Sequence, residues 1–335
     1  PRWDELLLSN PGSTFFHTAR WAKVLRDTYG YTPVYFARID SGRLEALLPV
    51  MDVRSPITGN RGVSLPFTDY SSPIVSGRVD PGSLLDEVKE HGAAAGWESV
   101  EIRGGEILFP GDGVPPSATF AGHRLELDGG AEAVFRKISR GMRSSIHKAA
   151  REGVEVSLSR TAESMDAFFL LNCLTRKRHG LPPQPYRFFR NIHRHVISED
   201  HGFVSLASWR GTPIAAAVFF HFHGKGIYKY GASDLSYQEH RPNNLVMWEA
   251  IRWFCDHGFR ELCFGRSDLD NKGLLQFKNS WGAVQGVIPY YRYDIGRKRF
   301  VAGGPRVAGF HNRLFRSLPI PVLKGIGSIL YRHLG

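Results

Sequence analysis

Apolar residues along the chain follow two periods, and the segments with each period occur in the same order twice. Residues 16–30 carry apolar side chains at helical spacing and finish at Gly30, a residue type that readily adopts the left-handed conformation at a helix end. Residues 165–180 repeat this pattern and finish at Gly180. The sequence therefore predicts one helix at equivalent places in each half of the chain.

Each predicted helix is followed by two short alternating runs around a turn, which is the pattern of a β-hairpin. The turn contains Gly42 in the first half and Gly211 in the second, 169 positions later. Ala46 and Ala215 have the same separation. The paired runs are residues 34–38 with 44–50, and residues 204–208 with 213–220.

A helix and a strand then close each half. The predicted helices are residues 83–95 and 244–257, and the strands are residues 96–102 and 258–264. Matched elements in one order indicate two copies of an α+β module, and the alternative is a chance similarity of a generic order of elements. The predicted organisation is an N-terminal domain over residues 1–133, a basic linker helix over 134–153, a C-terminal domain over 154–296 and a tail over 297–335.

The predicted linker helix is amphipathic and basic. Ile138, Met142, Ile146 and Ala149 fall on one helical stripe. Basic side chains occupy much of the remaining surface, namely Arg136, Lys137, Arg140, Arg143, Lys148 and Arg151. Such a helix can cover a core with its alkyl stems or present its charges to a phosphorylated ligand. The pattern leaves both interpretations open.

Composition is typical of a folded, water-soluble chain. Of the 335 residues, 42% are hydrophobic and 22% are charged, which excludes a disordered or fibrous protein. No apolar run reaches the ~18 residues of a membrane-spanning helix. The first residues lack the pattern of a secretory signal, although a signal upstream of them is not excluded.

The formal net charge of +11 is concentrated after Asp294, because no acidic residue follows it. The basic residues there are Arg297, Lys298, Arg299, Arg306, Arg313, Arg316, Lys324 and Arg332. A basic tail can bind RNA or phospholipid head groups, or it can remain solvated. Pro319 and Pro321 break the first part of the tail, and residues 322–334 are apolar enough to lie flat on an anionic leaflet. Packing onto the first domain is the interpretation that we favour.

The cysteines and histidines argue against a metal or disulfide framework. Cys173, Cys255 and Cys263 are an odd number without CxxC spacing, so a reduced, cytoplasmic protein is the simplest expectation. His221 and His223 would share one face of a strand, but no third ligand follows nearby, so no metal site is expected.

Polar residues follow the predicted strand that ends at residue 264. Gly265 permits an unusual backbone turn. Arg266, Ser267, Asp268 and Asp270 then lie at the carboxyl end of the strand, where open sheets commonly bind ligands. We expect a ligand site at this end of the strand.

Lys278 stands between two large aromatic residues, Phe277 and Trp281. A lysine in such surroundings can be partly desolvated and held over a ring face, which makes it a better fixed cation than a surface lysine. The alternative is an ordinary lysine whose stem covers apolar surface.

Two more segments carry candidate binding residues. In residues 227–233, alternation places Tyr228 and Tyr230 on one face of a strand. Residues 241–244 precede an apolar helix, whose free N–H groups can receive a phosphate or an oxyanion. Residues 64–73 take the comparable place in the first half, and a proline-bounded loop with aromatic and hydroxyl groups is typical of a binding wall.

Several enzyme classes lack their motifs in this chain. There is no GxSxG elbow, no GxxxxGK[ST] loop and no HExxH, which argues against hydrolases, nucleotide triphosphatases and zincins. Zinc-finger and RNA-recognition signatures are also missing.

Taken jointly, the remaining motifs resemble those of the Fem family of peptidoglycan-bridge aminoacyltransferases, and of its relatives in exopolysaccharide and PEP-CTERM protein-sorting clusters. The resemblance covers residues 15–293. It is carried by Phe264-Gly265-Arg266-Ser267, by Phe277-Lys278 with Trp281-Gly282, by the form RxxIxKAxxxGV over residues 143–154, and by Tyr230-Gly231-Ala232 with Pro242-Asn243-Asn244. It implies an α+β fold of two tandem GNAT-like domains, each a mixed, mostly antiparallel sheet flanked by helices, with the active site carried by the C-terminal domain.

The resemblance implies an acyltransferase that moves an acyl group, typically aminoacyl from tRNA, onto an amine of a cell-envelope precursor. Lys278 would stabilise the negative charge on the attacked carbonyl oxygen, an effect worth ~3 kcal/mol for one donor. Asp268 or Asp270 would accept the proton of the attacking amine. Arg143 and Lys148 would meet the phosphates of a carrier. The other predicted substrate-binding residues are Phe277, Arg266, Ser267, Tyr230, Asn244, Tyr70 and Trp281.

Two departures from the family leave the acyl donor open. The coiled-coil insertion of some Fem enzymes is absent, since the predicted linker is one short helix, and the [QR]xxGx[GA] loop of single-domain GNAT enzymes is missing. The donor is therefore aminoacyl-tRNA or acyl-CoA as a co-substrate, with no other cofactor expected. The alternatives are an acyl-CoA- or acyl-carrier-dependent acetyltransferase for an amino sugar, and a non-catalytic scaffold at the membrane. We expect a cytoplasmic protein, with peripheral contact at the inner face of the membrane as the alternative.

Overall fold

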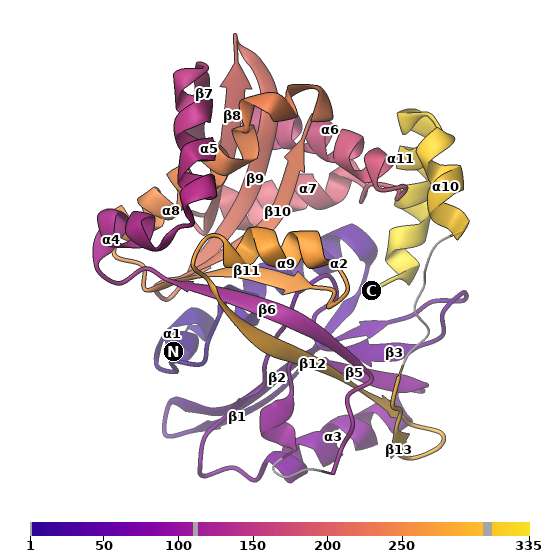
Figure 1. Cartoon of the computed structure of the whole chain (residues 1–335). Coiled ribbons are helices and arrows are strands. Elements are labelled where there is room, and N and C mark those ends of the chain that lie inside the picture. Colours follow the sequence, from indigo (N-terminus) through magenta and orange to yellow (C-terminus); the bar gives the residue numbers. More distant parts are fainter. Residues whose placement is uncertain (1, 110–112, 304–309) are drawn as a thin grey trace. The chain divides into compact units, whose positions relative to one another are not determined.

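The computed structural model describes residues 2–109, 113–303 and 310–335 (Figure 1). The chain forms two compact units that interleave along the sequence. The first unit contains residues 1–121, 287–307 and 329–335, and the second contains residues 122–286 and 308–328. These boundaries differ from those predicted, because residues 122–153 group with the second unit and residues 287–296 with the first.

The first unit is a mixed sheet with helices beside it. Its helices are α1 (Trp3–Leu8), α2 (Ala19–Tyr29) and α3 (Pro81–Ala94). Its strands follow the order β1 (Thr32–Asp40), β2 (Arg43–Val53), β3 (Arg61–Val63), β5 (Ser99–Arg103) and the last part of β12 (Val284–Asp294), with β4 (Ile74–Val75) beside β2 and β13 (Arg299–Phe300) beside β12. The pairs are antiparallel except β3 with β5.

The second unit has the same plan. From the second half of β6 (Ala118–Glu126), its strand order is β11 (Glu261–Ser267), β10 (Lys225–Ser233), β9 (Thr212–Phe222), β8 (Gly202–Trp209) and β7 (Val154–Ser159). The helices α4 (Gly130–Lys137), α5 (Arg140–Arg151) and α8 (Pro242–Asp256) lie on one face, while α6 (Ala162–Arg178) and α7 (Tyr186–Ile192) lie on the other (Figure 1). The predicted α+β class with mixed sheets flanked by helices is confirmed.

The two hairpins support the predicted duplication residue by residue. β1 pairs with β2, and β8 pairs with β9, in one register offset by 169 positions. Both ladders contain a bulge at the same place, after Arg38 and after Ala207. Both turns use two residues with positive φ, Ser41-Gly42 and Arg210-Gly211. Such turns match the twist of the flanking strands, so the register is fixed in the same way twice.

The basic segment over residues 134–153 is two helices rather than the one predicted. α4 ends at Lys137, Ile138 is extended and buried, and Ser139 caps α5 by accepting a hydrogen bond from the N–H of Met142 at 3.3 Å. Met142, Ile146 and Ala149 are buried against the core that α8 lines, as their spacing predicts. The apolar stripe thus makes α5 part of the second unit.

The tail forms α10 (Phe310–Ser317) and α11 (Ile320–Leu330), separated at Pro319 as expected from its prolines. Residues 310–328 group with the second unit, so the favoured interpretation, packing onto the first domain, is wrong for them. It holds for residues 329–335, where Arg61 donates hydrogen bonds to the backbone oxygen of His333 at 2.8 Å and Tyr31 donates to that of Arg332 at 3.0 Å. Across the described residues, none of the helices combines the length and apolar character needed to cross a membrane.

Candidate functional site

Two neighbouring strands of the second unit diverge after a short paired stretch. β10 and β11 are parallel, and the residues paired between them are Lys225–Ile227 with Glu261–Cys263. β10 stays paired with β9 as far as Ser233, while β11 runs on to Ser267. Because β10 follows β9 beyond that point, the side chains and backbone at the opening are available to line a cavity.

A bulge in β10 decides which tyrosine faces this opening. Tyr228 pairs with Phe219 and Tyr230 with Val218, so Lys229 is an extra residue in the ladder. One extra residue reverses the faces that follow it. The two tyrosines therefore do not share a face, as strict alternation had predicted.

The ring contacts agree with this reversal. The ring of Tyr228 packs beside Phe219 and Phe264, whereas that of Tyr230 packs against Phe188 and Phe189 on the α6–α7 face. Burial raises the pKa of Tyr228 to about 12, so its hydroxyl keeps its proton. By position it is Tyr228 that lines the cavity, whereas Tyr230 is half-buried on the other face, so the substrate role predicted for Tyr230 stays a prediction.

A cavity of about 450 Å³ lies beside the part of β10 that has left β11, and residues of α9 (Lys272–Asn279) rather than of β11 complete its lining. Its floor is made of small residues, and a Cβ at Gly231 would collide with the hydroxyl of Tyr228 and lie 3.0 Å from its Cζ. The wall is formed by side chains from five elements around the floor. The lining residues are Ser145, Thr175, Arg178, His179, Ala216, Ala217, Tyr228, Gly231, Ala232, Ser233, Gln238, Arg241, Asn243, Asn244, Val246, Met247, Leu274 and Phe277.

Hydroxyl and amide groups at one side of the cavity form a closed network. The Thr175 hydroxyl accepts a hydrogen bond from the N–H of Ser233 at 2.9 Å and donates to the carbonyl oxygen of the same residue at 3.1 Å. The amide of Asn243 donates to the Ser233 hydroxyl at 3.2 Å. The amide of Asn244 contacts the sulfur of Met142. These bonds fix β10, α6 and α8 to one another around the cavity.

Positive charge borders the cavity where α8 begins. Arg241 is exposed, has a φ of 55° and precedes Pro242, the first residue of α8. Arg178 also lines the cavity, at the end of α6. Burial, together with the neighbouring arginines Arg178 and Arg176, lowers the pKa of His179, so this imidazole is neutral at pH 7. The positive end of the α8 dipole and two guanidinium groups together favour an anion at this position.

Lys278 is buried, at 3% exposure, on α9 (Lys272–Asn279). Its ammonium donates hydrogen bonds to the carbonyl oxygens of Gly265 at 2.9 Å and Arg266 at 3.2 Å. The predicted aromatic neighbours are present, with the rings of Phe277 and Trp281 at 6.1 Å in an edge-on arrangement. Lys278 is thus a fixed, desolvated cation, but its charge is held by the end of β11 and it does not line the cavity.

Two buried polar side chains accompany Lys278. His123 on β6 and Ser267 on β11 are both 2% exposed, and the hydroxyl of Ser267 has no hydrogen-bond partner among the described residues. Burial, followed by the charge of Lys278, lowers the pKa of His123, and hydrogen bonds with the side chains of Asn279 and Gln285 oppose this shift. The imidazole is held neutral, because a nearby ammonium disfavours a second positive charge. Sequence reasoning missed His123 because nothing in its own segment marks it.

The remaining predicted residues are more dispersed. Asn244 and Phe277 line the cavity, Trp281 is buried beneath α9, and Arg266 and Asp268 are exposed at the end of β11. Tyr70 is half-buried in the first unit.

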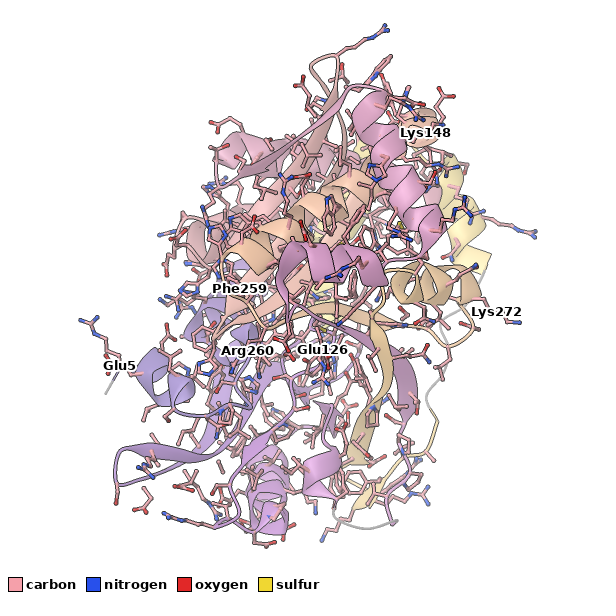
Figure 2. All side chains as sticks on the ribbon, turned by 60° about the vertical axis from the view of Figure 1, so that its left-hand side comes forward. Glu5, Glu126, Lys148, Phe259, Arg260 and Lys272 are labelled. Carbon is pink, nitrogen blue, oxygen red and sulfur yellow. The ribbon has the colours of Figure 1, made fainter. Side chains whose placement is uncertain are left out.

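The two predicted phosphate ligands on α5 differ in their surroundings. Lys148, labelled in Figure 2, is paired with Glu152 at 3.5 Å, and Glu152 is also 2.7 Å from Nδ1 of His240. Arg143 is half-buried on the same helix. Neither residue lines the cavity, so their predicted contact with carrier phosphates stays a prediction.

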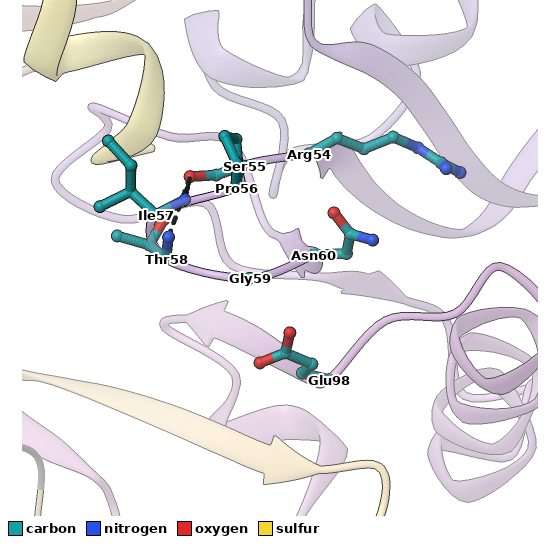
Figure 3. Close-up of a pocket in the computed structure, with 8 residues that line it drawn as sticks. All are labelled: Arg54, Ser55, Pro56, Ile57, Thr58, Gly59, Asn60 and Glu98. Atoms are coloured by element: carbon teal, nitrogen blue, oxygen red, sulfur yellow. Dashed lines mark hydrogen bonds between the residues drawn. The ribbon is translucent and has the colours of Figure 1, made fainter.

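A wider hollow lies in the first unit, with a volume of about 770 Å³ (Figure 3). It follows the loop from Arg54 to Asn60, with Glu98 on the facing segment. The Ser55 hydroxyl accepts hydrogen bonds from the N–H groups of Ile57 and Thr58 at 3.1 and 3.0 Å, so this hydroxyl stabilises the loop. The cavity of the second unit, with converging groups from several elements, is the better candidate. In the described part of the chain, no group of three or more histidine, cysteine or acidic residues is arranged to bind a metal.

Comparison with known proteins places the candidate site in context. Residues 136–278, which contain the cavity, match the model of the acetyltransferase (GNAT) domain. A crystal structure of FemX is similar over 85% of this chain and 94% of its own, with a TM-score of 0.67 and 16% sequence identity. A tandem GNAT protein from the clavulanic acid biosynthesis pathway is similar over 77% of this chain and 81% of its own, with a TM-score of 0.51 and 11% identity. The fold is a GNAT fold.

A curated relative carries a more specific name. The lipid II:glycine glycyltransferase of Staphylococcus epidermidis is 29% identical over 101 residues, which are 28% of this chain. The match covers 23% of that relative, so this chain spans about a quarter of its length. The GNAT match and this relative support the prediction of an acyltransferase.

Proposed function

We propose that the chain is an N-acyltransferase of the Fem type, which moves an aminoacyl or acyl group onto an amine of a peptidoglycan or exopolysaccharide precursor. The observation that carries this proposal is the cavity beside the part of β10 that has left β11, inside the segment that matches the GNAT domain. The free side of this strand offers backbone groups and a walled space to an acyl chain. We place this activity in the cytoplasm.

The cavity suits the acyl end of a donor whose carrier bears phosphate. Small residues on the floor leave room for the acyl group, and Tyr228 and Phe277 supply apolar walls. Arg241 and Arg178, with the first turn of α8, supply the charge that phosphate groups require. Aminoacyl-tRNA and acyl-CoA both have this combination of an acyl group and phosphates.

In the proposed reaction the amine attacks the carbonyl carbon of the donor. The new C–N bond forms as the bond from that carbon to the carrier oxygen, or to the sulfur of a thioester, breaks, and the carrier leaves with a proton. The attacking nitrogen must lose a proton, for which Asp268 is the acceptor predicted from the sequence. The neutral imidazole of His123, near Lys278, is a second candidate for the acceptor. Lys278 does not line the cavity, so it would act on the reacting carbonyl as a fixed positive charge at longer range, without direct contact.

The donor is identified by ligand-induced stabilisation. Aminoacyl-tRNA, acyl-CoA and acylated carrier protein are each titrated against the melting temperature of the full chain, because a ligand that binds the folded state raises it. We expect one of them to stabilise the protein, and an Arg241→Gln variant to need about tenfold more of it. Stabilisation by the thioesters alone would favour the amino-sugar acetyltransferase. If none stabilises the chain, the non-catalytic scaffold replaces this proposal.

The role of Lys278 is tested on the same helix. Lys278→Met keeps the stem and removes the charge, and we expect transfer to fall about 10²-fold or more. Lys272→Met, at the exposed start of α9 (Figure 2), is the matched control and should retain activity. Full activity in a folded Lys278→Met protein would remove Lys278 from the mechanism.

The proton acceptor is tested by pH profiles of the transfer rate. His123→Asn should lower the rate and abolish its acid limb, while Asp268→Asn should leave the limb in place. Loss of the acid limb in Asp268→Asn but not in His123→Asn would instead assign the role of proton acceptor to Asp268.

A further inference from the structure

The two tail helices are fixed to the second unit by close backbone contacts. A Cβ at Gly180, just beyond α6, would collide with the carbonyl oxygen of Asn312 in α10, and a Cβ at Gly327 in α11 would collide with that of Pro183. Leu323 is fully buried, and the ammonium of Lys324 lies 5.0 Å from the ring centre of Phe169. Both α10 and α11 therefore have an inner face that is firmly packed (Figure 1).

Their outer face carries large apolar side chains. Leu314 on α10 is 58% exposed, and Val322 on α11 is 46% exposed. On α6, Leu170 and Leu174 are 61% and 40% exposed.

These two leucines border the packed tail. Leu170 and Leu174 directly follow Phe169 and Cys173, the residues whose ring and thiol the ammonium of Lys324 approaches. We call the four residues Leu170, Leu174, Leu314 and Val322 the tail surface.

All the charged side chains of the tail are basic. Arg313 and Arg316 are exposed on α10, and no acidic residue follows Asp294 in the sequence. The last turn of α6 adds three more cations, Arg176, Lys177 and Arg178. The acidic residues of α6, Glu163 and Asp166, stand near its opposite end, and Asp166 accepts a hydrogen bond from Tyr186.

We propose that the tail surface docks the protein on an anionic lipid bilayer. An apolar face of this kind, flanked by cations and already held rigid by its inner contacts, can enter the head-group region while the arginines meet lipid phosphates. Charge complementarity selects an anionic bilayer over a neutral one, because the cations around the apolar face have no acidic partner on the tail. This inference does not depend on the proposed transfer reaction.

The test is flotation of the full chain with vesicles of phosphatidylglycerol mixed with phosphatidylcholine, and with vesicles of phosphatidylcholine alone. We expect binding to the anionic vesicles that weakens as salt is raised. The pair Arg313→Gln and Arg316→Gln should lower the partition coefficient about 25-fold, at about fivefold for each cation. Leu314→Ser with Val322→Ser should lower it by about tenfold or more.

Matched controls remove similar groups from the first unit. Ile39→Ser takes away an apolar side chain that is 52% exposed on β1, and Arg78→Gln takes away an exposed arginine. Both should bind vesicles like the unaltered protein, and all variants should keep its melting temperature, because every substituted side chain is at the surface.

The proposal fails if the unaltered protein stays off anionic vesicles, or if the controls lose as much binding as the tail variants. Sedimentation of the same proteins tests whether a second copy of the chain, rather than a bilayer, covers the tail surface. A dimer that Leu314→Ser and Val322→Ser convert to a monomer, without vesicle binding, would assign the tail surface to a second copy of the chain and overturn the bilayer.

Discussion

The two units share the order of their hairpin and the strands after it, but they differ in the space beside the strand that follows the hairpin. In each unit a hairpin leads to a strand that pairs in parallel over three positions, β3 with β5 and β10 with β11. In the second unit β10 continues along β9 and leaves a cavity. In the first unit β3 stops at Val63, and the following loop bonds back to the next strand, with the N–H of Ser64 on the carbonyl of Glu101 and that of Ser71 on the carbonyl of Arg103. The space beside this strand is thus open in the second unit and closed by a loop in the first.

Each arrangement is secured by a buried cation that binds main-chain carbonyls. In the first unit Arg103 donates to the carbonyl oxygen of Thr68 at 3.3 Å and pairs with Glu101 at 2.7 Å, so it holds the loop down. The loop needs this support, since Leu65 and Phe67 adopt positive φ. In the second unit Lys278 holds the end of β11 instead. The difference teaches that one copy of a duplicated fold can keep a cavity beside a strand while the other copy closes the same place with a loop.

The largest expected effect comes from opening the closed copy. Arg103→Met leaves buried carbonyl groups and Glu101 without their partner, so we expect the free energy of unfolding to fall by about 3 kcal/mol. Urea denaturation measures it. Arg38→Met removes an exposed ion pair with Glu87 and should cost less than about 1 kcal/mol. Equal losses in the two variants would show that Arg103 does not hold the loop.

The second effect is a pH dependence at one matched position of the hairpins. Asp52 in β2 accepts a hydrogen bond from the indole of Trp97 at 3.1 Å, whereas Nε2 of His221, 169 positions later in β9, has no partner among the described residues. Burial, then the neighbouring cations His201 and Arg160, lowers the pKa of His221 to about 4 against the opposing charge of Asp200.

The folded state therefore favours neutral His221. Its contribution to stability is complete above pH 6.5 and is lost as the pH falls towards 4, by about 2 kcal/mol. Hydrogen exchange should show β9 losing protection at pH 4.5 while β2 keeps more of its own. His221→Asn should flatten the change in β9, and an unchanged slope in that variant would assign it to other groups.

The third effect concerns the cavity of the second unit. Gly231→Ala places a methyl group against the hydroxyl of Tyr228, so the ring must move into the cavity. We expect affinity for the stabilising acyl donor to fall about tenfold or more, as read from the donor-induced rise in melting temperature. Tyr228→Phe in the same protein should recover part of the loss. Gly77→Ala in the first unit meets no atom within 4 Å and is the control. A Gly231→Ala protein that binds donor normally would show that the donor does not use this cavity.

The smallest effect compares the two hairpin turns. Ser41→Gly relieves a positive φ and should stabilise the protein by about 0.5 kcal/mol. Arg210→Gly relieves the same strain but also loses a guanidinium that stands 4.2 Å from the ring centre of Trp209, so the net change should be near zero. Thermal melting of both variants measures the difference, and equal shifts would mean that the arginine contributes nothing there.

The periodicity of the chain predicted the repeated helices, the hairpins and the closing strands, because each of these buries one face and signals it locally, but it did not predict β3, β6, α7 or β12. The hairpins were predicted to the turn residue. The bulge at Lys229 was not predictable, since no residue type demands it, and it moved the aromatic wall of the cavity from Tyr230 to Tyr228. His123 was missed for another reason. Its neighbours are distant in sequence, and only the folded sheet brings it beside Lys278.

The interleaving of the two units has a consequence for how the protein is made. The chain enters the first unit, leaves it, returns for residues 287–307 and returns again for residues 329–335. During translation, the second unit can assemble most of its sheet while the first still lacks the strand beside β5 and the contacts of Tyr31 and Arg61. The first unit precedes the second in the chain but is therefore among the last to be completed, and a premature stop near residue 290 would leave the first unit without the end of β12 and the second unit without α10 and α11.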